Sequence, residues 1–143
     1  MSYKLKRDEI LKFITDNPIF SLATCSHNQP FARMIMMYTA DTENGIVFST
    51  WKQKDLHDQL VFNPNVELCF YNAQQGKQLR IKGRVEILED EFFKKKIGMK
   101  FKFLRPQIEK FGYDSMMVCR LKKGKATFWS LATAFEDKSY FNF

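Results

Sequence analysis

Five residues in two nearby stretches of the sequence carry groups that bind anions. Ser49, Thr50, Lys52 and Lys54 follow one another where a probable strand ends and a probable helix begins, and Arg33 lies earlier in a strand-like segment. Because the start of a helix carries partial positive charge, lysines there are mildly destabilising unless an anion lies among them. A phosphate would accept hydrogen bonds from the hydroxyl, ammonium and free N–H groups together. The junction therefore predicts a ligand that bears a phosphate group.

Arg33 supplies the second cation of this hypothesis. It precedes the apolar residues Met34, Ile35 and Met36, and a guanidinium in such a strand needs a partner, for which phosphate offers two parallel hydrogen bonds. A phosphate monoester carries about −1.5 to −2 charges at pH 7, which Arg33 and Lys54 together would neutralise. Two plainer interpretations stay open: lysines that are simply solvated, and an arginine that reaches water or meets a carboxylate.

Other chemistries have less support in the sequence. The two histidines, His27 and His57, have no cysteine or carboxylate at metal-ligand spacing, so we expect no metal site and no haem. A Ser/His/Asp arrangement, a GxGxxG fingerprint and a P-loop are absent as motifs. No residue stands out as an acid or a base, and the catalytic residues stay unknown.

Composition predicts one domain spanning residues 1–143. The chain is 45% hydrophobic, enough to fill a single core, and its net charge of +7 favours anionic partners. Three widely spaced cysteines without a CxxC pair predict a reducing, cytoplasmic location. No membrane span or signal peptide is expected. The segment 92–105, which mixes Phe with Lys94, Lys95 and Lys96, is predicted to be an amphipathic face with solvated lysines.

The elements that must position these residues are mostly strands. Helices are expected over 6–16 and 53–62, and a broken helix over 90–111; strands are expected over 19–26, 31–40, 46–50, 66–71, 77–88, 116–122 and 125–131. Short turns between successive strands predict an antiparallel sheet that closes or nearly closes into a small barrel. We therefore expect a mainly β fold with flanking α-helices, an α+β split β-barrel of about six antiparallel strands.

Two of these strands have informative patterns. In the strand at 77–88, Leu79 and Ile81 alternate with Arg80 and Lys82, which predicts one core face and one polar face. In the strand at 31–40 both faces are apolar apart from Arg33. A strand of that kind in an antiparallel barrel must have its outer face covered by a helix, a ligand or a second subunit.

The order of short motifs along the chain resembles the pyridoxamine 5′-phosphate oxidase-like family, and most closely its short FMN-binding members of the general stress protein 26 type. The motifs are Asn17-Pro18, Ser21-Leu22-Ala23-Thr24, Gln29-Pro30, Arg33, Gly45-Ile46-Val47-Phe48-Ser49-Thr50, Lys54-Asp55-Leu56, Gln59-Leu60, Asn63-Pro64-Asn65-Val66-Glu67, Gln78-Leu79-Arg80-Ile81-Lys82-Gly83 and Ala126-Thr127-Phe128-Trp129-Ser130. The resemblance implies a split-barrel homodimer with FMN in each of two clefts between the subunits.

The resemblance also implies roles for single residues. Arg33 and Lys54 would hold the FMN phosphate, with Ser49 and Thr50 adding hydroxyl and backbone contacts. The main chain of Met34, Ile35 and Met36 would run along the isoalloxazine ring. Gln78 and Trp129 would approach the ring or the ribityl chain, from the same or the other subunit, although Trp129 could equally be a packing residue.

The function implied is that of an FMN-dependent oxidoreductase with an unknown small-molecule substrate. The arginine- and histidine-containing C-terminal segment that grips the substrate of the vitamin B6 enzymes has no counterpart after Trp129, so we do not expect pyridoxamine phosphate oxidation. The alternatives are a non-catalytic flavin carrier or redox sensor and, less favoured, a basic nucleic-acid-binding barrel. The last would place aromatic side chains on the polar face of a strand, where this chain has Gln78, Arg80 and Lys82.

Overall fold

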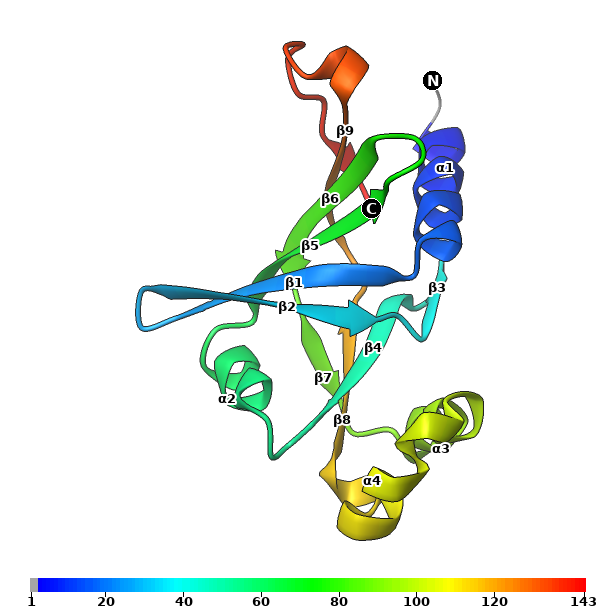
Figure 1. Ribbon diagram of the computed structural model, residues 1–143, viewed down its shortest axis with the longest axis vertical. Coiled ribbons are helices and arrows are strands. Elements are labelled where there is room, and N and C mark those ends of the chain that lie inside the picture. Colours follow the sequence, from blue (N-terminus) through cyan, green and yellow to red (C-terminus); the bar gives the residue numbers. More distant parts are fainter. Residues whose placement is uncertain (1–2) are drawn as a thin grey trace.

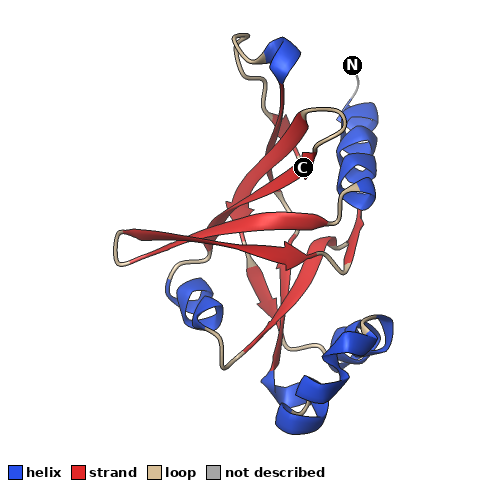
Figure 2. Cartoon of the chain, viewed as in Figure 1, coloured by secondary structure: helices blue, strands red, loops and turns tan. Residues whose placement is uncertain are grey.

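In the computed structural model, which describes residues 3–143, ten strands form two antiparallel sheets with helices around them (Figures 1 and 2). One sheet has the order β10-β9-β6-β5-β1-β2 and the other the order β3-β4-β8-β7. The strands are β1 (Ile19–Ser26), β2 (Gln29–Met36), β3 (Thr39–Asp41), β4 (Gly45–Trp51), β5 (Asn65–Asn72), β6 (Lys77–Arg84), β7 (Glu86–Leu88), β8 (Met116–Leu121), β9 (Gly124–Ser130) and β10 (Phe141–Asn142). The helices are α1 (Tyr3–Asp16), α2 (Asp55–Phe62), α3 (Glu91–Lys100) and α4 (Arg105–Phe111), with 3₁₀ turns η1 (Lys102–Leu104), η2 (Tyr113–Ser115) and η3 (Leu131–Thr133).

The expected fold class, mainly β with flanking helices, is confirmed, but the expected number of strands is too low. Two predicted long strands each pass from one sheet to the other. The strand predicted at 31–40 divides into β2 and β3, because the Met37 N–H bonds to Pro18 O while the next N–H, of Tyr38, bonds to Val47 O in β4. The strand predicted at 77–88 divides into β6 and β7 at Val85, whose N–H bonds to Pro64 O.

A two-residue turn sets the register of the β1–β2 hairpin. His27 and Asn28 both have positive φ, 52° and 63°, which is the geometry of a type I′ turn. The register that follows places Arg33 opposite Leu22, on the face that β1 turns towards the core. A slip of one residue would move Arg33 to the other face of the sheet, so this turn determines where the guanidinium points.

The main hydrophobic core occupies the space between the two sheets, and a second, smaller hydrophobic cluster lies outside it. Phe20, Leu22, Phe48 and Phe70 are fully buried in the main core, to which both sheets and α1 contribute. A second cluster lies beneath α3 on the far face of the four-stranded sheet and consists of Val47, Trp51, Ile97, Met116 and Val118. None of the helices in the described part of the chain has the length and hydropathy needed to cross a membrane.

The outer face of the six-stranded sheet, the face turned away from the main core, carries several exposed apolar side chains. On β2, the edge strand, Met34 is 64% and Met36 43% exposed. Ile19 on β1 and Tyr71 on β5 continue this surface, since Ile19 pairs with Met36 in the strand register. The predicted apolar outer face of this strand is therefore present, and within one chain it is uncovered.

Gly45, the first residue of β4 after the turn from β3, should not tolerate a side chain. Its φ is +71°, and an added Cβ would lie 2.6 Å from Lys122 Cα and closer still to the Leu121 carbonyl. Gly45→Ala is expected to lower the free energy of unfolding by about 3 kcal/mol, from strain and clash together. Gly76, with φ +56° and nothing within 4 Å of an added Cβ, is the matched control, and Gly76→Ala should cost only about 1 kcal/mol. Urea unfolding measures the free energy of unfolding of both variants. Equal losses in the two would show that backbone strain alone, without a clash, accounts for the effect at Gly45.

Candidate functional site

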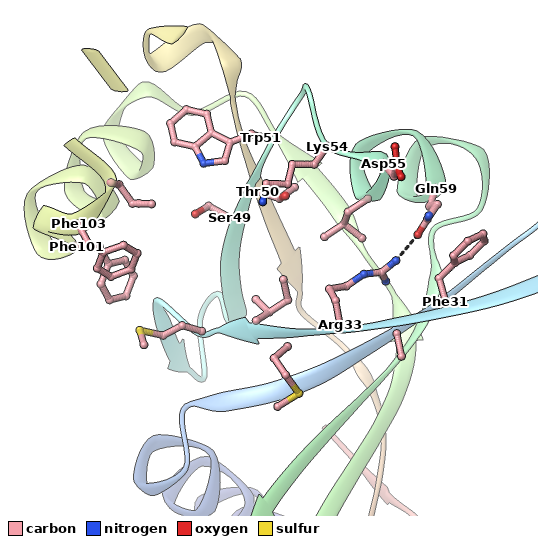
Figure 3. A pocket seen from close by; sticks show the side chains of 16 residues that line it. Phe31, Arg33, Ser49, Thr50, Trp51, Lys54, Asp55, Gln59, Phe101 and Phe103 are labelled. Atoms are coloured by element: carbon pink, nitrogen blue, oxygen red, sulfur yellow. Dashed lines mark hydrogen bonds between the residues drawn. The ribbon is translucent and has the colours of Figure 1, made fainter. Parts of the chain in front are cut away.

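A cleft of about 620 Å³ opens between the edge strand β2, the end of β4, the start of α2 and the η1 turn (Figure 3). This volume lies within the range of typical small-molecule sites. Seven of the nine predicted site residues line it, namely Arg33, Met34, Ile35, Met36, Ser49, Thr50 and Lys54. They come from three separate elements, so the fold gathers the predicted phosphate-binding groups at one place.

Arg33 is held by neutral partners. One guanidinium nitrogen donates to Leu22 O at 3.1 Å and to Thr24 Oγ1 at 2.9 Å, and the other donates to Gln59 Oε1 (Figure 3). In the described part of the chain no carboxylate forms an ion pair with it. Desolvation lowers the pKa of the partly buried guanidinium from its usual value, but an arginine stays charged in proteins. The cleft therefore contains a fixed positive charge that the described residues do not neutralise.

Thr24 and Gln59 orient Arg33, a role that the sequence analysis did not predict for either residue. Both side chains are buried, and Gln59 Oε1 accepts hydrogen bonds from Thr24 Oγ1, at 2.7 Å, and from the guanidinium. Such a buried polar network is stable because each member has a partner. Gln59 lies on the core-facing side of α2 beside Leu60, and a polar residue at such a position was the one available signal of this role.

Lys54 and Lys52, which the sequence analysis grouped together, have different surroundings. Lys54 is the N-cap residue of α2, is exposed, and forms no ion pair with any described residue; no side chain caps the helix start. Lys52 lies 3.6 Å from Glu89 Oε1 and does not line the cleft. Helix α2 begins at Asp55, two residues later than predicted. This places Lys54, the free first-turn N–H groups and the β4 hydroxyls at one end of the cleft.

Asp55 is the one carboxylate among the residues that line the cleft. It is the first residue of α2, where a negative charge interacts favourably with the helix dipole. The end of the cleft that holds Arg33 and Lys54 therefore has two cations and one carboxylate.

The opposite end of the cleft is apolar. Phe101, Phe103 and Leu104 from the α3–η1 segment face Ile35 and Met36 of β2 across it. The Phe101 and Phe103 rings lie 5.4 Å apart, and Phe103 is 63% exposed. A cleft with a cationic end and an aromatic end fits an amphipathic ligand that carries an anionic group at one end and a planar apolar group at the other.

Gln78 and Trp129 do not line this cleft. They pair with each other in the register of β6 and β9, far along the sheet from β2, and Gln78 Oε1 accepts a weak hydrogen bond from Cys69 Sγ at 3.8 Å. Trp129 lines a separate cavity of about 260 Å³ beside the 131–140 loop. Within one chain these two residues therefore cannot contact a ligand bound at Arg33.

The prediction of solvated lysines in the 92–105 segment is wrong for Lys94. Its side chain is buried, and the ammonium lies 3.1 Å from Glu89 and 3.7 Å from Glu91. The hydrogen bond from Lys94 lowers the pKa of the Glu89 carboxyl, which also faces Lys52. Alternation of phenylalanine and lysine does not reveal which lysine packs against the sheet. Here Lys94 holds α3 against the connection that follows β7, through Glu89, which also faces Lys52 in the turn after β4.

A comparison with known protein families identifies the chain. The model of the pyridoxamine 5′-phosphate oxidase family matches residues 7–128. The chain belongs to this family. A curated relative, the pyridoxine/pyridoxamine 5′-phosphate oxidase of Burkholderia mallei, is 36% identical over 72 residues, which is 50% of this chain and 33% of the relative. The chain thus matches only about a third of the length of that enzyme.

Solved structures confirm the split-barrel fold of the family. A NimC/NimA family protein from Clostridium acetobutylicum has a TM-score of 0.76 at 22% identity and covers 95% of this chain and 92% of its own. A protein from the same organism related to general stress protein 26 has a TM-score of 0.70 at 16% identity, covering 99% and 96%. A pyridoxamine 5′-phosphate oxidase-related, FMN-binding protein from Nostoc punctiforme has a TM-score of 0.67 at 14% identity, covering 100% and 99%.

Proposed function

We propose that this protein binds FMN in the cleft between β2, β4, α2 and η1, with the phosphate between Arg33 and Lys54. The observation that carries the proposal is the Arg33 guanidinium, which is held in place by neutral groups and has no carboxylate partner among the described residues. A preorganised guanidinium without a carboxylate partner, at the cationic end of a cleft, is suited to a phosphate. A relative of the same fold is described as FMN binding.

The remaining parts of the cleft fit the rest of FMN. Ser49, Thr50 and the first turn of α2 offer hydroxyl and N–H donors beside the phosphate. The isoalloxazine would lie along the main chain of Met34, Ile35 and Met36, whose direction leads from the cationic end to the aromatic end. There Phe101 and Phe103 provide the apolar surface that a flat ring requires.

Bound FMN would supply the redox chemistry, and the chain would bind, orient and shield it. The lining residues at the aromatic end, such as Phe101, Phe103, Leu104 and Met36, carry no ionisable side chain. A proton needed there would come from water or from the substrate. This arrangement supports an oxidoreductase of the pyridoxamine 5′-phosphate oxidase type whose substrate is not a vitamin B6 phosphate. It suits a flavin carrier or redox sensor equally well, because neither needs an acid or a base.

We propose further that the protein is a homodimer joined through the outer face of the six-stranded sheet. Met34, Met36, Ile19 and Tyr71 are exposed there, and a second copy would bury them. The interface of a two-fold dimer pairs the same patch on both subunits. With the two-fold axis running along the strands, such stacking places the β9–β10 side of one sheet over the β2 edge of its partner. Gln78 and Trp129 would then approach the FMN of the other subunit.

Flavin uptake tests the proposal. Stripped protein is titrated with FMN and with riboflavin, absorbance and flavin fluorescence are recorded, and light scattering on the loaded sample gives the mass. We expect one FMN per chain, tighter binding of FMN than of riboflavin, and a dimer. Lys54→Ala should lower the ratio of FMN affinity to riboflavin affinity. Lys52→Ala removes the same charge two residues away and should leave this ratio nearly unchanged, because Lys52 lies outside the cleft. Protein that takes up neither flavin would contradict the proposal.

A further inference from the structure

The loop between β9 and β10, residues 131–140, presents apolar side chains to solvent. Leu131 is 79% exposed, and Phe135 is fully exposed. The loop has a defined shape, since Ser130 and Thr133 cap η3 reciprocally and Glu136 N donates to Thr133 O at 3.1 Å. An ordered loop that holds a phenylalanine away from its own chain suggests a surface on another molecule that receives this side chain.

A segment of matching character contributes Phe101, Phe103 and Leu104 to the wall of the cleft and carries its basic side chains outside it. The segment from α3 to α4 (residues 91–111) has seven basic and two acidic residues, and its Lys95, Lys102 and Arg105 are exposed without a carboxylate partner among the described residues. In the 131–140 loop Glu136 and Asp137 are likewise exposed and unpaired within the described chain, and together with Lys138 they give the loop a net charge of −1. The two segments therefore share exposed phenylalanines, Phe103 and Phe135, and carry complementary charges beside them.

The two segments cannot meet within one chain. Figure 1 shows the 131–140 loop at one end of the longest axis and the α3–α4 segment at the other. In the proposed two-fold dimer the loop of one subunit can lie close to the α3–α4 segment of the other. Loop 131–140 follows the end of β9, and the proposed dimer sets the β9–β10 side of the sheet beside the partner's β2 edge, next to which the partner's Phe101 and Phe103 lie. The partner that fits this surface is a second copy of the chain.

We propose that loop 131–140 of each subunit covers the aromatic end of its partner's cleft. Phe135 packs against Phe103 of the partner subunit, and Glu136 and Asp137 face the basic α3–α4 segment. The loop thereby excludes water from the ring end of the bound flavin and limits access to flat, apolar substrates that can enter between two phenylalanines. This inference rests on the proposed dimer and FMN site. It adds a residue, Phe135, that controls which substrates enter.

A mixed-subunit cross-link tests the contact. One subunit carries Phe135→Cys and an affinity tag, the other carries Phe103→Cys, and the FMN-loaded mixture is oxidised with diamide before peptide mapping. We expect a disulfide between positions 135 and 103 of different subunits. The control pair joins Phe135→Cys to Val61→Cys, because Val61 is an exposed apolar residue of α2 outside the cleft, and should give no cross-link. All three changes are at exposed positions, so folding should be retained.

The outcomes separate this inference from the proposed function. A dimer that holds FMN but forms no 135–103 disulfide would overturn the loop contact and leave the flavin site standing. A monomer would overturn both the dimer and the loop contact. A second measurement uses Phe135→Ala: iodide should quench the bound flavin severalfold more efficiently than in the parent protein, with FMN affinity little changed. Val61→Ala is the matched control, and unchanged quenching in both variants would contradict the cover.

Discussion

Arg33→Ala is expected to weaken FMN binding by roughly 30- to 100-fold while leaving riboflavin binding nearly unchanged. Hydrogen bonds to a charged group contribute about 1.5–3 kcal/mol, and every 1.4 kcal/mol changes a dissociation constant tenfold. Riboflavin lacks the phosphate, so it does not depend on the guanidinium. Fluorescence titration of both flavins with parent and variant protein gives the two ratios.

Arg33→Lys is the conservative control for this experiment. It keeps the charge but loses the fork that reaches Leu22 O, Thr24 and Gln59 at once, so its FMN affinity should fall between those of the parent and Arg33→Ala. An equal loss for riboflavin and FMN in Arg33→Ala would mean that the phosphate lies elsewhere and that Arg33 serves the fold. The comparison therefore tests the position of the phosphate as well as its presence.

Gln59→Glu should reduce FMN affinity on the order of 100-fold without changing the size of the side chain. The amide oxygen that accepts from Arg33 becomes a carboxylate, which forms an ion pair with the guanidinium and repels the phosphate. Two unit charges a few ångströms apart in a partly buried site interact with several kcal/mol, about 4 kcal/mol at 4 Å, and less at the greater distance of a bound ligand. Parallel titrations with FMN and riboflavin measure the effect, and riboflavin should again bind almost as before.

Gln59→Met separates charge from orientation. It removes the acceptor that Arg33 and Thr24 share but adds no charge, so FMN affinity should drop only modestly, by about tenfold or less. If Gln59→Met and Gln59→Glu weakened FMN binding equally, the affinity would depend on the orientation of Arg33 and not on its uncompensated charge. Circular dichroism on both variants checks that α2 remains folded.

The gathering of Arg33, Lys54 and the two hydroxyls at one end of the cleft could be predicted from sequence because its signal is local. Lys54 lies beside two hydroxyls at a strand-to-helix junction, and Arg33 is conspicuous among methionines. The neutral groups that hold Arg33 could not be predicted in the same way. Thr24 and Gln59 lie 35 residues apart, and their hydrogen bond exists only because β1 and α2 pack together. The role of an amide or a hydroxyl depends on neighbours that the tertiary structure provides.

The fold class could likewise be predicted, from the alternation of apolar and polar residues along the strands. The points where a strand passes from one sheet to the other could not be predicted. Nothing in the composition of the 31–40 or 77–88 segment marks Met37 or Val85 as the point where hydrogen bonding moves to another partner strand. Lys94 illustrates a related limit, since its neighbours Lys95 and Lys96 are exposed as predicted and only the rotation of α3 buries Lys94. Gln78 and Trp129 do not line the cleft of their own chain, so their predicted approach to the ligand stays a prediction that depends on the proposed dimer.

The small second core beneath α3 bears on how such a protein could acquire new substrates. Two of the residues that would contact a substrate, Phe101 and Leu104, pack against this second core rather than against the large core that holds the two sheets together. Regions with their own packing can open or repack without global unfolding. Substitutions in the α3–η1 wall can therefore accumulate at small thermodynamic cost, while the proposed phosphate site at β2 and the start of α2 stays in place. The architecture separates the part of the site that can diversify during evolution from the part that must stay constant.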